Sequence, residues 1–96
     1  MNFTEITALL IDRGFSIEGF SNSSIEFRRV ENGLVTIFDL EEEDINISVR
    51  DNETREYILD IDVKMNVLNK ILLHLLILSL LNVAKVRQNV LLIREN

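Results

Sequence analysis

The sequence contains no cysteine, and among its 96 residues there are only three glycines and one histidine. Without thiols the chain forms neither disulfides nor thiolate metal sites, and a secreted domain of this size commonly needs such a crosslink. We therefore expect a reducing, cytoplasmic environment. The glycines Gly14, Gly19 and Gly33 are isolated from one another, so the sequence carries no phosphate-binding loop and no dinucleotide fingerprint.

The single histidine, His74, has no serine, cysteine or carboxylate at a catalytic-motif spacing. A lone imidazole lacks the base-and-orienter geometry that catalysis requires. A pH-sensitive contact is one interpretation of this residue, and a partly exposed position on the polar side of a helix is the favoured one. We therefore expect no enzyme activity and no cofactor.

Positive charge is also scarce, with ten Lys and Arg against sixteen Asp and Glu and a net charge of −6. Such a chain is poorly suited to phosphate backbones, so we expect no direct nucleic-acid binding. The most apolar stretch, residues 71–81, would span only about 16 Å as a helix, against roughly 30 Å of bilayer hydrocarbon. Residues 1–5 lack a signal-peptide pattern. We expect neither a membrane span nor a leader.

The residues that are present describe an ordinary globular chain, 47% hydrophobic and 27% charged, which we interpret as a single domain over residues 1–96. Asn2 and Glu5 form a capping-box-like start, and apolar residues then recur at helical spacing until Gly14. We expect a short extended piece at Phe15 and Ile17. Residues 19–24, rich in Gly, Ser and Asn, predict a loop.

From residue 25 the apolar period changes to two, and Asn32 followed by Gly33 is a strong hairpin signal because a type I′ turn needs positive φ at both positions. A four-residue connection over residues 41–44 and a third loop of three or five residues within 51–55 keep one face apolar. The pattern predicts a four-stranded antiparallel meander over residues 25–63. The expected pairs are Ile25 with Leu40, Phe27 with Phe38, Glu31 with Leu34, Leu40 with Ile45 and Phe38 with Ile47, and Tyr57, Leu59, Ile61 and Val63 are expected on the same face.

Residues 64 to about 87 predict a long hydrophobic C-terminal helix and complete an α+β fold. Its apolar surface runs almost all the way round, so it should be buried on more than one side. An unbroken helix to Arg94 would be about 45 Å long, whereas a compact domain of this size is about 32 Å across. We expect a break near residues 79–82 or projection into a partner, with residues 89–93 as an alternative short strand. The main apolar stripe is expected to contain Leu68, Leu72, Leu75, Val83, Val86 and Val90, and the expected oligomer interface is Leu73, Ile77, Leu80 and Leu81.

Carboxylates gather in two places. One group, at the tip of the second hairpin, is Glu41, Glu42, Glu43 and Asp44, and the other, on the polar face of the sheet, is Glu26, Asp39, Asp60 and Asp62. The tip suits either a basic protein partner or simple solvation, and it lacks the ligand spacing of a calcium loop. The sheet group suits a mixed binding surface, acid–base chemistry or a cation, with Asp62 alternatively capping the following helix.

In size and charge the chain is similar to small inhibitors, immunity proteins and phage-encoded anti-defence proteins, which act by occupying a basic surface. We therefore expect a non-enzymatic interaction module that binds a basic protein surface through both carboxylate groups. The alternative is a homo-oligomeric structural or chaperone-like subunit, a dimer in its simplest form, assembled through the C-terminal helix. The least favoured hypothesis is a hydrolase or metal enzyme using Asp39, Asp60 and Asp62.

Overall fold

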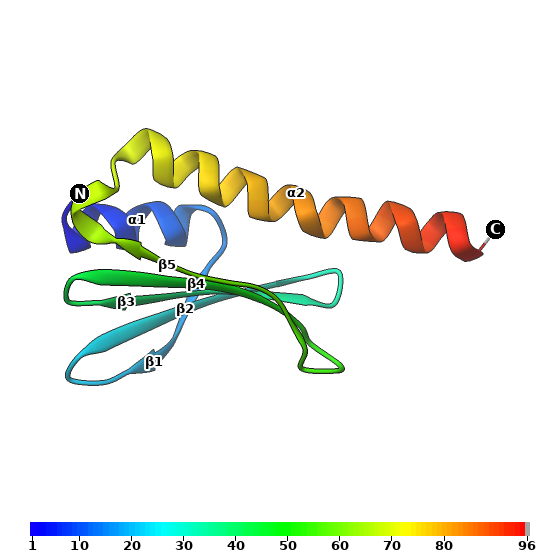
Figure 1. Cartoon of the computed structure of the whole chain (residues 1–96), viewed down its shortest axis with the longest axis horizontal. Helices are drawn as coiled ribbons and strands as arrows, with labels where there is room; N and C mark the ends of the chain where they lie inside the picture. Colours follow the sequence, from blue (N-terminus) through cyan, green and yellow to red (C-terminus); the bar gives the residue numbers. More distant parts are fainter. Residues whose placement is uncertain (96) are drawn as a thin grey trace.

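The computed structural model describes the backbone of residues 1–95 and the side chains of residues 1–85. It is an α+β structure in which two helices lie on one face of an antiparallel sheet (Figure 1). In chain order the elements are α1 (Phe3–Asp12), β1 (Ser16–Phe20), β2 (Ser24–Glu31), β3 (Leu34–Glu41), β4 (Asp44–Asp51), β5 (Tyr57–Lys64), a 3₁₀ turn (Met65–Val67) and α2 (Lys70–Glu95).

Helix α1 begins and ends where the sequence predicts. The Asn2 side chain accepts a hydrogen bond of 2.8 Å from the Glu5 backbone N–H, which satisfies one of the free donors of the first turn. After the last helical residue, Gly14 adopts a φ of +88° and its N–H donates to the Ile11 carbonyl. This left-handed residue turns the chain so that Phe15 enters the core.

The sheet has five strands in the order β1-β2-β3-β4-β5, one more than the sequence predicts. The additional strand is β1, which was expected to be a short extended piece followed by a loop. The serine-rich segment forms a tight turn instead, in which the Ser21 N–H donates to the Ser24 carbonyl and the Ser21 Oγ accepts from the Ser24 N–H. A register shift between Ile17 and Gly19 interrupts the alternation of β1, and this irregularity concealed the strand.

The predicted register of β2, β3 and β4 is confirmed. Each of the five expected cross-strand pairs is present. Asn32 and Gly33 have φ values of +51° and +76°, as a type I′ turn requires. The connection from β3 to β4 is shorter than expected, because β3 continues to Glu41 and β4 begins at Asp44.

The β4–β5 loop covers the five residues 52–56, which is one of the two predicted lengths. Val49 faces Leu59 as required, but the register then shifts so that Arg50 pairs with Tyr57. The strand bulge therefore moves Tyr57 out of the apolar row in which it was expected.

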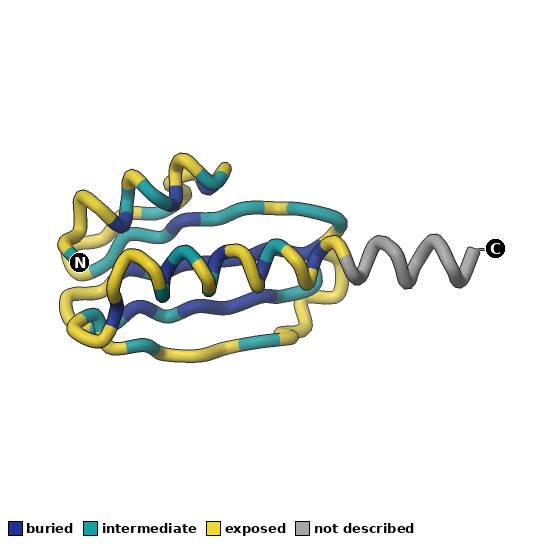
Figure 2. Tube along the Cα trace, turned by 90° about the horizontal axis from the view of Figure 1, so that it is seen from above, coloured by how far each residue is buried: buried dark blue, intermediate teal, exposed yellow. Residues whose placement is uncertain are grey.

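The core lies between the helices and the sheet. Phe15 packs edge-on against Phe38 with ring centroids 5.2 Å apart. Viewed from above, α2 crosses the middle of the sheet and leaves an edge of the sheet largely exposed (Figure 2). The buried residues of this core include Ile6, Leu10, Phe27, Phe38, Ile45, Ile47, Leu68, Leu73, Ile77, Leu80 and Ala84.

Helix α2 differs from the prediction in its start, its length and its orientation. The Asn69 side chain caps the helix by accepting a hydrogen bond of 2.8 Å from the Leu72 N–H. Asp62 therefore has no capping role. The helix is one element from Lys70–Glu95, with no break at residues 79–82 and no strand at 89–93, and it runs past the end of the sheet (Figure 1). Within the described residues no helix is both long and apolar enough to cross a bilayer.

The face of α2 that packs on the sheet also corrects the predicted stripe. Leu73 and Ile77 are fully buried and Leu80 nearly so, whereas Leu75, assigned to the buried stripe, is 54% exposed. The reason is that the 3₁₀ turn and the Asn69 cap separate Leu68 from the helix, so a helical wheel that starts at Leu68 has the wrong phase. The outward face of α2 instead presents Ile71, Leu75 and Leu78.

Candidate functional site: the open face of the sheet

The face of the sheet opposite the two helices is uncovered, and we refer to it as the open face (Figure 1). Alternate residues of each strand point toward it, because successive side chains of a strand lie on opposite sides. The register therefore decides which open-face side chains become neighbours. The two ends of this face differ in charge.

The acidic end contains four side chains in one row across β2 to β5: Glu26, Asp39, Asn46 and Asp62. The Asn46 amide donates to Asp60 at 2.8 Å and to Asp62 at 3.0 Å, which holds these two carboxylates together. One oxygen of Asp39 is buried and has no hydrogen-bond partner among the described residues. The structure thus brings together all four carboxylates that the sequence assigned to this face.

The carboxylates of the hairpin tip lie at the same end of the sheet. Glu41, Glu42 and Glu43 are exposed, while Asp44 pairs with Lys64 at 2.9 Å. The hydrogen bond to Asp44 raises the pKa of Lys64 above its usual value. The predicted tip and the predicted sheet group therefore lie at the same end of the sheet, where Asp44 is paired with Lys64 and Glu26 with Arg28.

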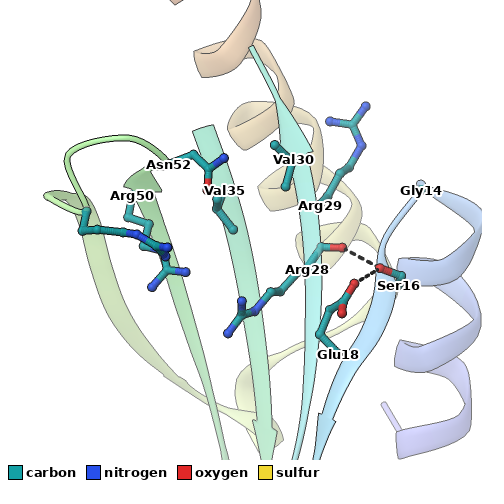
Figure 3. A pocket seen from close by; sticks show the side chains of 10 residues that line it. Gly14, Ser16, Glu18, Arg28, Arg29, Val30, Val35, Arg50 and Asn52 are labelled. Carbon is teal, nitrogen blue, oxygen red and sulfur yellow. Dashed lines mark hydrogen bonds between the residues drawn. The ribbon is translucent and has the colours of Figure 1, made fainter. Parts of the chain in front are cut away.

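The opposite end of the open face carries arginines, which the sequence analysis did not identify as a group. Arg28 on β2 and Arg50 on β4 reach toward each other across β3, above the small side chains Val30 and Val35 (Figure 3). Arg55 in the β4–β5 loop completes the rim of this open groove. The predicted strand register places Arg28 on the open face. Continuing that register to the end of β4 would have placed Arg50 on the same face.

Two apolar open-face residues are buried although no helix covers them. Val35 is 2% exposed and Ile37 is 5% exposed. Both lie on β3, where Ile37 is the cross-strand neighbour of Arg28 and Val35 that of Arg50. The aliphatic stems of arginines suit such positions, because they cover apolar neighbours and keep the charge near the surface. The long charged side chains therefore contribute packing as well as charge to the open face.

The side chain of the histidine contacts an arginine. His74 is half-buried between the helices, and the Arg13 guanidinium lies 2.9 Å from its Nδ1. Within the described residues no group of three His, Cys, Asp or Glu side chains is arranged to hold a metal ion. The Asn46 amide donates to both Asp60 and Asp62 and so links the two carboxylates.

The structure places the residues of the predicted oligomer interface at different depths. Leu73, Ile77 and Leu80 are buried within the chain, and Leu81 is half-buried. Among the described side chains of α2, the exposed apolar ones are Ile71, 75% exposed, together with Leu75, Leu78 and Val83.

Comparison with protein-family models, curated proteins and solved structures finds no match to this chain.

Proposed function

We propose that the protein is a non-enzymatic interaction module of the inhibitor type, whose acidic end docks on a basic surface of a protein partner. The observation that supports this most directly is the row of carboxylates on a sheet face that no helix covers. The exposed Glu41, Glu42 and Glu43 extend that row beyond the edge of the strands.

The geometry favours recognition because the charges are held by backbone pairing. Strands β2 to β5 fix the spacing of Glu26, Asp39 and Asp62, so a partner's cations would meet a surface that is already ordered. Electrostatic complementarity of this kind raises the association rate and suppresses wrong partners more than it raises affinity. This suits a small inhibitor that must find one target.

The experiment uses matched baits for affinity capture from host extract. One bait carries Asp39→Asn, Asp60→Asn and Asp62→Asn together, because asparagine keeps the shape and still accepts the hydrogen bonds from Asn46. The control bait carries Glu5→Gln, Glu53→Gln and Glu56→Gln, which removes the same charge from exposed positions away from the acidic row. We expect a salt-sensitive basic partner that binds the wild type and the control but not the acidic-row bait.

Capture of the same partner by all three baits, unchanged at high salt, would exclude the electrostatic mechanism, because exposed charge interactions are screened beyond roughly 8–10 Å at physiological ionic strength. The bait variants need a folding check by circular dichroism. A partner lost equally from the control bait would show that total charge, rather than the acidic row, governs binding.

A second function is favoured by a different observation, the outward apolar side chains of α2. Ile71, Leu75 and Leu78 are exposed on the helix face turned away from the sheet. We propose that this surface supports assembly into a homo-oligomeric structural subunit. Light scattering of the wild type and of Leu75→Glu tests it, with a smaller mass expected for the variant. A wild type that stays monomeric at millimolar concentration contradicts it.

A further inference from the structure

The groove at the arginine end of the open face has the composition of an anion site. Its floor is apolar, formed by Val30 and Val35, and its walls are the guanidinium groups of Arg28 and Arg50 (Figure 3). Arg55 and Asn52 lie at the rim. Guanidinium groups donate hydrogen bonds in a rigid fork that matches the oxygens of carboxylate and phosphate groups.

The arginines of the groove are incompletely paired. Arg28 donates to both carboxylate oxygens of Glu26 at 3.2 and 3.1 Å. No carboxylate of the described residues lies within ion-pair distance of Arg50. The Nε atoms of both arginines are buried and have no hydrogen-bond partner among the described residues. A buried donor without an acceptor is costly, so an acceptor supplied by a ligand would be favoured there.

The backbone at the rim provides an independent observation. Arg55 adopts a φ of +69°, a left-handed conformation that glycine or asparagine would occupy at lower cost. The other non-glycine residue with positive φ is Asn32, which is common in such turns. An arginine retained in a strained conformation at the rim of an arginine-lined groove indicates that its side chain is needed there.

We infer that this groove binds the phosphate group of a phosphate monoester, held by Arg50 and Arg55 with Arg28 beside them. Two guanidinium groups with no ion pair to the described carboxylates supply more positive charge than a monocarboxylate needs. The groove is also open and about 630 Å³ in volume, which leaves space for the ester substituent. Glu18 also lines the groove, but it lies on β1 beside Ser16, on the side remote from Arg50 (Figure 3). This site goes beyond the proposed function and does not depend on the protein partner.

Titration of the full chain with methyl phosphate, followed by ¹H–¹⁵N NMR at constant ionic strength, tests the proposal. We expect saturable shifts centred on the backbone of Val35, Arg50 and Asn52 and on the Arg50 Nε–H. Arg50→Gln should raise the dissociation constant about tenfold, which corresponds to one charge-assisted hydrogen bond of roughly 1.4 kcal/mol. Arg55→Gln, at the exposed rim, should raise it severalfold without any change in folding.

The matched control is Lys85→Gln, which removes one positive charge from an exposed position on α2 and should leave the dissociation constant within twofold of the wild type. Linear shifts spread over many cationic residues, or equal affinities in wild type, Arg50→Gln and Arg55→Gln, would overturn the site. Acetate binding as tightly as methyl phosphate would overturn the assignment to phosphate. Binding of inorganic phosphate with rejection of the ester would overturn the assignment to a monoester.

Discussion

The two faces of the sheet bury apolar residues in different ways. On the helix-covered face, Phe38 is fully buried and meets the Phe15 ring edge-on. On the open face the neighbouring Ile37 is 5% exposed, although both helices lie on the other side of the sheet. The first arrangement is a packed interior that sets stability. The second leaves charged groups at the surface of an ordered layer, where they are available to a partner.

Stability therefore depends mainly on the helix-covered face and recognition on the open face, so substitutions on the two faces should have different effects. Changes on the helix-covered side should act on the free energy of unfolding. Changes on the open face should act mainly on binding, with small and sometimes favourable effects on stability.

The largest effect is expected at Ile77, which is fully buried where α2 packs on the sheet. Ile77→Glu would place an unpaired carboxylate in the core, at a cost of about 4 kcal/mol or more, and should prevent stable folding. Leu75→Glu, two residues earlier and 54% exposed on the outward side of the helix, should change the free energy of unfolding by no more than about 0.5 kcal/mol. Urea denaturation of both variants checks this, and similar losses would contradict the orientation of α2.

The orientation of α2 shows what the sequence could not determine. The sequence pattern of this segment offers no clear polar side, so the phase assigned to the helix depends on where the helix begins. The start of α2 is set by the Asn69 cap and the preceding 3₁₀ turn. Neither feature is visible in the sequence, because the apolar residues recur without interruption from Leu68 onward. The α+β class and the two helices were predictable, whereas the buried face of α2 was not.

The sheet is the opposite case, because the register of β2 to β5 followed from alternation and one Asn-Gly turn. Once the register was known, the neighbours Glu26, Asp39 and Asp62 followed as well. The strand β1 was missed because its bulge breaks the alternation. The arginine groove was missed because Arg28, Arg50 and Arg55 are far apart in sequence and meet only when the register is extended to the end of β4.

The second prediction compares neighbouring residues of β3. Phe38→Ala removes a ring from the packed core and should cost about 3–5 kcal/mol in the free energy of unfolding. Ile37→Ala on the open face should cost only about 1–2 kcal/mol, since the flexible arginine stems above it can collapse into the space. Chemical denaturation measures both, and an equal cost would show that the open face is packed as rigidly as the core.

The third prediction concerns Arg55 and its left-handed backbone. The left-handed conformation costs about 1–2 kcal/mol for a residue with a Cβ, and a glycine avoids this cost. Glycine also loses more conformational entropy on folding, which offsets part of the stabilisation. Arg55→Gly should therefore raise the free energy of unfolding by about 0.5–1 kcal/mol while weakening phosphate binding. Thermal unfolding and the methyl phosphate titration measure the two effects on the same sample. A loss of stability would show that Arg55 contributes packing that outweighs the backbone strain.

The smallest effect is expected at Asp39, which lies directly opposite Glu26 and has one buried oxygen that finds no hydrogen-bond partner among the described residues. Like charges facing each other across strands are destabilising by a few tenths of a kcal/mol to about 1 kcal/mol. Asp39→Asn should therefore raise the free energy of unfolding by about 0.5 kcal/mol, and it should also reduce capture of a basic partner.

The opposite signs of these two effects make Asp39 the sharpest test of the contrast between the faces. A residue that lowers stability while strengthening binding is retained for its function rather than for the fold. Asp12→Asn, an exposed change of equal charge on α1, serves as the control and should alter neither quantity appreciably. If Asp39→Asn destabilised the sheet, the carboxylate would have a structural role, and the acidic row would no longer be explained by recognition of a partner.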